Sequence, residues 1–296
     1  MKRNISSYFV ENKEVSVTGS FPKIARLRSE YYVFVDDPHG FISEVRGSEV
    51  KADLFTFLQK VPDKEPKYNF YFEWDKIAVL TISSYEDWWK KQLNDKSRNM
   101  IRKALKKRVE VKVVAFTDDF VKGIKEIYDE TPIRQGKPFS HYREDFETLK
   151  RSHISFLERS DFIGAFFNNE LIGFAKLVHG DGVSSLMQII SKISHRDKAP
   201  TNALISKAVE ICEQNSVNYL HYGIWSRRGL GEFKRHHAFK PFEVPRYFVP
   251  LNLMGNIILK LGIHKGILQQ LPKKWKDIFI DQRNKWYSIW QGKQNV

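Results

Sequence analysis

The sequence has a single cysteine and no long apolar run, and each absence limits the class of protein. With Cys212 alone among 296 residues, no disulfide within the chain can hold the fold, which is typical of a reducing compartment. No stretch approaches the roughly 20 uninterrupted apolar residues of a membrane-spanning helix. Met1-Lys2-Arg3 is followed by no apolar segment, so we expect no secretory signal peptide. We therefore expect a cytoplasmic location.

Common catalytic and metal-binding motifs are absent too. The sequence contains no Gly-x-Ser-x-Gly elbow, no His-Glu-x-x-His, no paired cysteines and no Walker loop. Gly229-Leu230-Gly231 lacks the third glycine of a dinucleotide-binding loop. The adjacent His236 and His237 have no partners at the spacing of a metal site, so a surface or packing role is the simpler interpretation. We expect neither a metal nor a tightly bound cofactor.

What the sequence does contain is positive charge within a globular composition. Hydrophobic residues make up 42% of the chain and charged residues 28%, as in a folded domain. The 49 Lys and Arg residues outnumber the 35 Asp and Glu residues, which gives a net charge of +14. A charge of this size attracts polyanions such as RNA, DNA or an anionic membrane. A charge that only keeps the protein soluble is the alternative that composition leaves open.

Aromatic and β-branched runs suggest that residues 1–95 are rich in strands. The elements predicted there are a strand at residues 31–35, a turn at 36–40, a helix at 51–59 and a pair of strands at 68–74 and 77–82. No linker rich in Gly, Ser or Pro follows this region. We therefore do not expect it to be an independent module.

Helices and strands alternate in the middle of the chain. Amphipathic stripes predict helices over residues 87–108 and 118–129, with a strand at 109–116 between them. The turn signals Asn168-Asn169 and Gly180-Asp181-Gly182 separate three strands of an antiparallel meander. From there on the predicted elements are strands at 161–167, 171–178 and 183–191, a helix at 202–214, a strand at 218–224, a helix at 230–237 and a strand at 239–249.

Residues 251–296 combine an apolar band with positive charge. The apolar residues of the band are Leu251, Leu253, Met254, Ile257, Ile258, Leu261, Ile263, Ile267, Leu268 and Leu271. The basic residues that interrupt or follow it are Lys260, His264, Lys265, Lys273, Lys274 and Lys276. Such a segment either lies in an anionic lipid interface or packs on the protein's own core with its lysines in water. The sequence leaves both alternatives open.

Four short segments occur in an order and at spacings that match one protein family. They are residues 97–104, 127–136, 218–223 and 229–234, the last of which reads Gly-Leu-Gly-Glu-Phe-Lys. Together with the predicted order of strands and helices, they resemble the GNAT acyltransferase superfamily. The resemblance is closest to its FemAB-like branch, which includes the aminoacyltransferases of peptidoglycan cross-bridges.

The resemblance implies an α+β fold with a mixed, mostly antiparallel GNAT-like sheet flanked by helices. Residues 96–250 would form the acyltransferase domain. Residues 1–95 would form a strand-rich region, open to interpretation as a reduced first GNAT half, and residues 251–296 a basic helical extension.

The family also implies where a donor would bind. In ordinary GNAT enzymes a Gly-rich loop at a helix N-terminus holds the pyrophosphate of coenzyme A. The corresponding residues 195–202 contain no glycine, which makes close backbone approach harder, although a helix N-terminus still attracts anions. Acyl-CoA and aminoacyl-tRNA therefore both remain open as co-substrates. By this resemblance the donor phosphate would be bound by Lys198, Ala199, Thr201 and Asn202.

Two residues are predicted to be catalytic by the same resemblance. Lys234 occupies the family's Phe-Lys position, where a lysine would stabilise an oxyanion or bind a phosphate; the alternative is an ordinary surface lysine. Tyr222 lies near the end of the core strand and would shuttle a proton or orient the acceptor; the alternative is a strand aromatic that only packs. Since His221 points to the opposite face of a regular strand, we choose Tyr222 over it.

Two further groups of residues are predicted to bind substrates. A polar loop, of the kind that often recognises ligands, leads to the prediction that the acceptor is bound by Glu130, Arg134, Gln135, His141 and Tyr142. Trp225, just after the predicted strand 218–224, is predicted to bind the acceptor with them. Residues 96–108 carry seven positive side chains and no acid. Since solvated helix faces usually pair such charges with Glu, we predict that a polyanion is bound by Arg98, Arg102, Lys103 and Lys106. Solvated surfaces are the alternative for both groups.

We therefore predict an N-acyltransferase that moves an acyl or aminoacyl group from a thioester or aminoacyl-tRNA to an amino group. The acceptor would be a small-molecule or lipid-linked precursor of the cell envelope or of a polysaccharide. The expected larger partner is either tRNA or an anionic membrane surface; in the second case the cytoplasmic protein would attach peripherally to the inner face of the membrane. Since fold does not determine function, a non-catalytic nucleic-acid-binding protein on a degenerate GNAT scaffold is the alternative.

Overall fold

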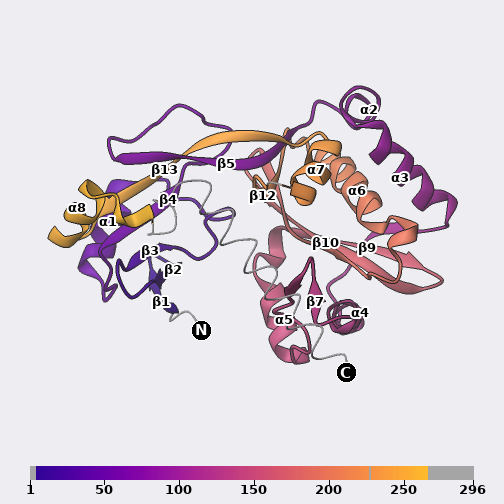
Figure 1. Ribbon diagram of the computed structural model, residues 1–296, viewed down its shortest axis with the longest axis horizontal. Coiled ribbons are helices and arrows are strands. Elements are labelled where there is room, and N and C mark those ends of the chain that lie inside the picture. Colours follow the sequence, from indigo (N-terminus) through magenta and orange to yellow (C-terminus); the bar gives the residue numbers. More distant parts are fainter. Residues whose placement is uncertain (1–4, 227, 266–296) are drawn as a thin grey trace. The chain divides into compact units, whose positions relative to one another are not determined.

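The computed structural model describes residues 5–226 and 228–265 (Figure 1). This part of the chain divides into two compact units. The first unit contains residues 5–74, 133–138 and 244–265, and the second contains residues 75–132 and 139–243. The chain passes between the units inside two strands, β5 (Tyr71–Thr81) and β13 (Lys240–Pro250). Both units are therefore discontinuous in sequence.

The first unit contains a small mixed sheet. Its other elements are β1 (Ile5–Val10), β2 (Lys13–Thr18), β3 (Ile24–Leu27), α1 (Pro38–Gly47), β4 (Leu54–Leu58), β7 (Ile133–Arg134), β8 (Lys137–Pro138), α8 (Leu253–Lys260) and η4 (Ile263–Lys265). The strand order is β1-β2-β3-β4-β13, antiparallel except for the pair β3–β4. Helix α1 packs on this sheet, with the ring of Phe41 centred 5.6 Å from that of Phe55.

The second unit contains the larger sheet. Its elements after β5 are α2 (Tyr85–Asp87), η1 (Trp88–Gln92), α3 (Asp95–Lys106), β6 (Glu110–Val114), α4 (Asp118–Asp129), α5 (Phe146–Ile154), η2 (Leu157–Arg159), β9 (Ser160–Phe167), β10 (Glu170–Gly180), β11 (Val183–Ser191), η3 (Arg196–Lys198), α6 (Pro200–Gln214), β12 (Tyr219–Ile224) and α7 (Arg228–His236). The strand order is β5-β12-β11-β10-β9-β6, and every pair except β11–β12 is antiparallel.

Helices cover both faces of this larger sheet (Figure 1). Successive residues of a strand point to opposite faces, so β9 contributes to two cores. Ile163 and Ala165 pack in the cluster that contains residues of α3 and α6. Phe162 and Phe174 pack in the cluster that contains residues of α4 and α5. The second unit is therefore a three-layer structure.

The predicted α+β class, with a mostly antiparallel sheet flanked by helices, is confirmed. Strand β11 and helix α4 have the predicted bounds. The turn between β9 and β10 forms because Asn168 and Asn169 both adopt positive φ, at 49° and 64°, which a two-residue hairpin of this type requires.

Two predictions in the N-terminal region are wrong because a helix start was mistaken for a turn. Residues 31–35 form no strand, and residues 36–40 contain the start of α1. The carboxylate of Asp37 accepts hydrogen bonds from the backbone N–H groups of His39 and Gly40, both at 3.1 Å. Pro38 occupies the first helical position, where its missing N–H is not needed.

Three further predicted elements are wrong. Residues 51–59 contain no helix but the strand β4, whose five residues are all buried. A strand that is buried on both faces has no alternation of apolar and polar residues, so its apolar residues were misread as helical spacing. Residues 68–74 and 77–82 are not two strands, because β5 runs through both. The helix predicted over residues 87–108 is interrupted, since Leu93 is extended between η1 and α3.

None of the helices in the described part of the chain is long and apolar enough to cross a bilayer. The later residues of the predicted C-terminal band, from Ile267 onward, lie outside the described residues.

Candidate active site

The strands β11 and β12 pair over a short distance and then separate. Only the parallel pairs Val183↔Tyr219, Ser184↔Leu220 and Ser185↔His221 join them. The register of β12 then shifts between His221 and Ile224, where Gly223 has a positive φ of 62°. The last part of β12 therefore leaves β11, while β11 stays paired with β10 along its whole length. This divergence is confirmed as predicted.

Helix α7 places Lys234 against the diverging end of β12. The side chain is buried, and its ammonium donates to the backbone carbonyls of Tyr222 (2.6 Å) and Ile224 (2.7 Å). The Nζ atom also lies 4.5 Å from the centre of the Tyr222 ring. Carbonyls two residues apart point to the same side of a strand, which allows one ammonium to bind both.

Burial determines the electrostatics of this pair. It lowers the pKa of Lys234 to about 8 and raises the pKa of Tyr222, because each charged form loses its hydration. At neutral pH Lys234 is therefore mainly an ammonium and Tyr222 keeps its proton, so both are hydrogen-bond donors. Two of the three N–H groups of Lys234 are engaged by the carbonyls.

His221 takes no part in this arrangement as a charge. It is buried, and burial together with the charge of Lys234 lowers its pKa to about 3. Tyr222 is half-buried and packs on Phe239, with ring centres 5.5 Å apart. The choice of Tyr222 over His221 as catalytic residue stays a prediction.

The residues predicted to bind a donor phosphate lie before and within the first turn of α6. Ala199, at φ 53°, precedes the helix, and Pro200 removes one N–H group from its first turn. The hydroxyl of Thr201 lies 2.9 Å from that of Ser191. The amide of Asn202 donates to Nε2 of His237 at 3.1 Å, since Nδ1 of that histidine donates to the carbonyl of Phe233.

The loop between β11 and α6 binds a carboxylate from another segment of the chain. The carboxylate of Glu130 accepts from the backbone N–H groups of Ile193 and Ser194 and from the Ser194 hydroxyl, the last two at 2.8 and 2.7 Å. Lys198 lies over the ring of Phe167 and 3.2 Å from Asp197. Glu130, predicted to bind the acceptor, therefore contacts the two residues that precede the predicted donor segment 195–202.

The other predicted acceptor residues are dispersed. His141 lies 2.9 Å from the carboxylate of Glu144, and the ring of Tyr142 lies under the guanidinium of Arg143. The backbone N–H of Trp225 donates to the carbonyl of Lys76 at 2.8 Å. Arg134 and Gln135 belong to the hairpin of β7 and β8, which is part of the first unit. Their roles stay predictions.

The four predicted polyanion contacts on α3 differ in what they touch. The guanidinium of Arg98 donates to the carbonyls of Trp89 and Leu93, both at 2.9 Å, and pairs with Asp95. Arg102 lies over the ring of Trp89. Lys106 is exposed and Lys103 half-buried. Arg98 therefore fastens the turn before α3, and the predicted phosphate contacts of Arg102, Lys103 and Lys106 stay predictions.

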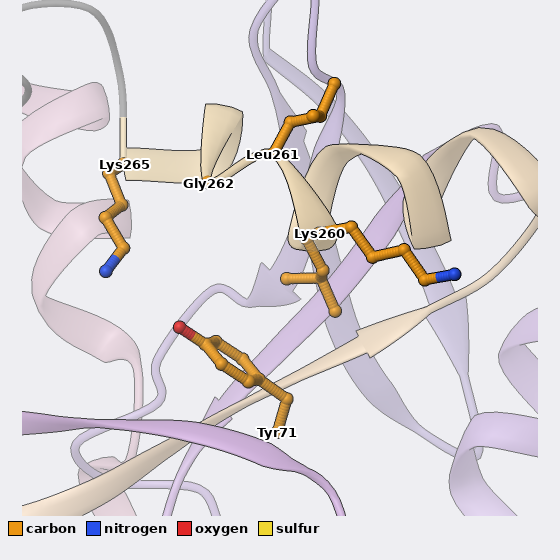
Figure 2. A pocket seen from close by; sticks show the side chains of 6 residues that line it. Tyr71, Lys260, Leu261, Gly262 and Lys265 are labelled. Atoms are coloured by element: carbon orange, nitrogen blue, oxygen red, sulfur yellow. The ribbon is translucent and has the colours of Figure 1, made fainter.

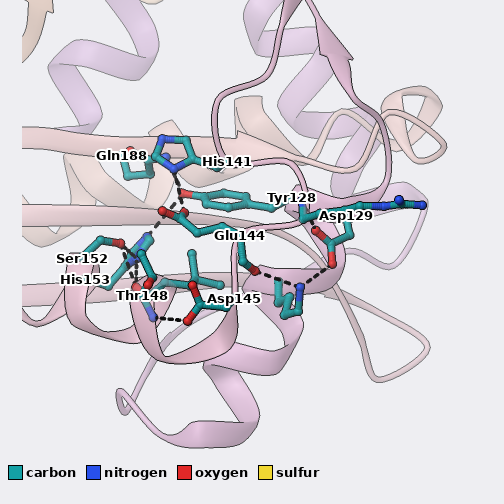
Figure 3. A network of polar contacts seen from close by, with 12 residues as sticks. Tyr128, Asp129, His141, Glu144, Asp145, Thr148, Ser152, His153 and Gln188 are labelled. Carbon is teal, nitrogen blue, oxygen red and sulfur yellow. Dashed lines mark hydrogen bonds and ion pairs between the residues drawn. The ribbon is translucent and has the colours of Figure 1, made fainter. Parts of the chain in front are cut away.

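The sequence analysis did not predict a polar network that includes Gln188, in the part of β11 beyond its pairing with β12 (Figure 3). The hydroxyl of Tyr128 accepts from the amide of Gln188 at 2.6 Å and lies 3.4 Å from Nε2 of His153. Nδ1 of His153 lies 2.9 Å from the carbonyl of Leu149, and burial lowers the pKa of this histidine. Tyr128 lies in one of the family-like segments, but its apolar helical spacing suggested only core packing.

A Ser-His-Asp arrangement also crosses the sheet, and its burial identifies it as structural. His179 lies 2.9 Å from the carboxylate of Asp161 and 2.8 Å from the hydroxyl of Ser184. A nucleophile must reach its substrate, whereas Ser184 is fully buried. These side chains therefore join β9, β10 and β11. In the described part of the chain no three His, Cys, Asp or Glu side chains form a potential metal site.

No protein-family model matches the chain, and no curated protein matches it in sequence. Solved structures do match. A C-terminal domain named for lysylphosphatidylglycerol synthetase from Agrobacterium fabrum is 14% identical, covers 88% of this chain and 89% of its own, and gives a TM-score of 0.55. FemX is 10% identical, with coverages of 88% and 90% and a TM-score of 0.57. L-PGS from Bacillus licheniformis is 13% identical, with coverages of 88% and 89% and a TM-score of 0.52.

The fold is GNAT-like, of the FemAB-like type. The separation of β11 from β12 and the mostly antiparallel sheet of the second unit belong to this GNAT-like fold. Because each match covers 88% of the chain, the likeness extends over both units. At these identities the comparisons establish the fold alone.

Proposed function

We propose that the protein is an N-acyltransferase that moves an aminoacyl group from aminoacyl-tRNA to an amino group. The observation that carries this proposal is the pair formed by the buried ammonium of Lys234 and the half-buried Tyr222, at the point where β12 leaves β11. Acyl transfer needs a donor aimed at the developing oxyanion, and it needs a group that passes a proton to the leaving oxygen.

The reaction assigns one role to each residue. The acceptor amine attacks the ester carbonyl of the aminoacyl group, so that a C–N bond forms and the C–O bond to the tRNA ribose breaks. The third N–H of Lys234 stabilises the oxyanion. Tyr222, which like any tyrosine is protonated at neutral pH and whose pKa burial raises further, donates to the departing ribose oxygen. The proton that the amine loses restores the tyrosine hydroxyl.

Three features support aminoacyl-tRNA over acyl-CoA. Glu130 already occupies N–H groups of the loop before α6, and its charge repels a pyrophosphate there. The helix begins with Ala199 and Pro200 rather than glycine. The basic face of α3, with Arg102, Lys103 and Lys106, suits an RNA backbone. One of the similar structures also bears the name of lysylphosphatidylglycerol synthetase, which denotes an amino acid joined to a lipid.

Binding and transfer together test this proposal. Full-length protein would be titrated with aminoacyl-tRNA, deacylated tRNA and coenzyme A at low and at physiological salt. We expect both RNAs to bind with a steep salt dependence, because phosphate contacts release counterions, and coenzyme A not to bind. Saturable coenzyme A binding without RNA binding would contradict the proposal that aminoacyl-tRNA is the donor. Aminoacyl-tRNA that binds but never loses its label to any amine, amino sugar or lipid-linked amine would favour the nucleic-acid-binding alternative.

Replacing Lys234 with Met is expected to lower the rate of transfer about 100-fold or more, the usual cost of removing an oxyanion donor. Lys176 provides a matched control, because it too is buried, and it donates to the backbone carbonyls of His153 (2.7 Å) and Ser155. Burial also lowers its pKa to about 8. Lys176 belongs to β10, and its ammonium binds the last carbonyls of α5, where a cation stabilises a helix end.

The two variants Lys234→Met and Lys176→Met would be assayed well below their melting temperatures. If Lys234 only holds backbone carbonyls, both variants lose stability and neither loses its rate of transfer. We expect only Lys234→Met to lose the rate.

A further inference from the structure

Helix α8 presents an apolar face to solvent. Leu253, Ile257 and Leu261 recur every four residues, so they lie along one side of the helix, and their exposed fractions are 84%, 48% and 65%. Met254 extends this face with an exposed fraction of 44%. Soluble domains rarely leave so many large aliphatic side chains together in water. Within the described residues, α8 buries only Gly255 and Ile258.

The opposite side of α8 is fixed to the first unit. A Cβ atom at Gly255 would lie 2.1 Å from the carbonyl oxygen of Asp53, so the helix approaches that backbone as closely as it can. The amide of Asn252 donates to the carbonyl of Ala52 at 3.2 Å and caps the helix through Gly255. The exposed face therefore keeps a defined orientation on this unit.

The turn that follows α8 is also fixed. The carboxylate of Glu73 on β5 receives hydrogen bonds from Tyr71 (2.9 Å) and from His264 (2.8 Å), and it pairs with Lys265 (2.9 Å). These residues adjoin a hollow of about 530 Å³ whose lining includes Tyr71, Lys260 and Lys265 (Figure 2). The Tyr71 hydroxyl and the Lys265 ammonium already bind Glu73, so neither group is available to bind a ligand in the hollow. The contacts of Glu73 with His264 and Lys265 hold η4 in place after α8.

Charge beside this face selects the partner. Lys260 is exposed at the end of α8, and Lys265 is exposed at the end of η4. Over residues 251–296 the sequence holds eight Lys and Arg residues against two acids, Asp277 and Asp281. The same stretch contains three tryptophans, a residue enriched at membrane interfaces. Aliphatic side chains flanked by lysines match the acyl-chain boundary and the phosphates of an anionic bilayer.

We propose that the outward face of α8, formed by Leu253, Met254, Ile257 and Leu261, docks on an anionic lipid surface. The aliphatic side chains enter the headgroup region, and the exposed Lys260 binds a lipid phosphate. This inference does not depend on the proposed transfer reaction, because it uses residues of the first unit, whereas Lys234 and Tyr222 belong to the second. A second copy of the chain would not explain the excess of positive charge beside the apolar face, since like charges would meet there.

Vesicle flotation of the full-length protein tests the proposal. We expect the protein to float with vesicles that contain phosphatidylglycerol at low salt, and not with phosphatidylcholine vesicles. The double variant Leu253→Ser with Leu261→Ser should lower the bound fraction at least tenfold. Phe9→Ser is the matched control, because Phe9 is 77% exposed on β1 of the same unit. Wild-type protein that stays soluble, equal binding to both vesicles, or an equal loss with Phe9→Ser would overturn the proposal.

A cysteine reporter decides what covers the face without lipid. Cys212 is fully buried, so Leu253→Cys adds one reactive thiol for a polarity-sensitive dye. We expect rapid labelling in solution and a blue shift of the dye with anionic vesicles. Slow labelling at every protein concentration would mean that the chain's own residues 266–296 cover α8. Labelling that slows as the protein is concentrated would mean that a second copy does. Either result would overturn the proposal.

Discussion

Gly231→Ala is expected to lower the rate of transfer as much as Lys234→Met does and to destabilise the protein by roughly 1–3 kcal/mol. A Cβ atom at residue 231 would lie 2.0 Å from the carbonyl oxygen of Ser226, a distance that no rotamer change relieves because both atoms are backbone-fixed. Helix α7 must therefore move. Lys234 lies one turn further along the same helix, so its hydrogen bonds to the carbonyls of Tyr222 and Ile224 would be lost with that movement.

The neighbouring glycine gives the matched control. A Cβ atom at Gly229 would have nothing within 4 Å, and Gly229→Ala would raise the helix propensity of α7. We expect this variant to keep its rate of transfer and to be as stable as the wild type or slightly more stable. Chemical denaturation and the transfer assay measure both effects. Equal behaviour of the two alanine variants would show that the close approach to Ser226 does not position Lys234.

Acid is expected to destabilise the protein by about 4 kcal/mol between pH 7.5 and pH 5, through two buried histidines. Burial lowers the pKa of His221 to about 3 and that of His237 to about 4, against about 6.5 in an unfolded chain. The native state therefore keeps both rings neutral while the unfolded state takes up protons. Stability is complete above pH 6.5 and is lost as the pH falls toward 4 and then 3. Each ring contributes about 2 kcal/mol at pH 5.

Urea unfolding at the two pH values measures this loss. Tryptophan fluorescence is a suitable signal, since the indole N–H of Trp88 donates to the carbonyl of His237 at 3.1 Å. At pH 5 most carboxylates of the unfolded chain are still charged, so the histidines dominate the difference. His237→Gln should reduce the pH-dependent loss by about half. A loss below about 1 kcal/mol in the wild type, or an unchanged loss in the variant, would contradict the prediction.

Local signals in the sequence were enough for the later part of the second unit, from β9 to β12. The paired asparagines at 168 and 169 can adopt positive φ and therefore place β9 beside β10. The apolar stripe of α6 and the short strand β12 were also readable from spacing alone. The first unit was harder because β4 is buried on both faces, which removes the alternation of a strand. The order of its strands depends on pairing between β4 and the distant β13, for which a single sequence holds no local signal.

The sequence suggested candidate site residues, whose roles stay predictions, but it did not indicate their hydrogen-bond partners. Lys234 was found through a short family-like segment, whereas its acceptors are backbone carbonyls that any sequence would supply. Which carbonyls face it depends on the shift in β12 at Gly223. Tyr128 and Gln188 were missed because they are 60 residues apart, and their hydrogen bond exists only once α4 packs on the sheet.

The discontinuous units impose an order on biosynthesis. A nascent chain leaves the ribosome from its N-terminus, and domains generally fold as soon as their segments have emerged. The second unit has all its segments once residue 243 is out, but β4 must wait for residues 246–250 of β13 before its antiparallel neighbour exists. The segments made first therefore complete their unit last. We expect the strands at the N-terminus to need protection from premature pairing during translation, and no single truncation to yield either unit intact.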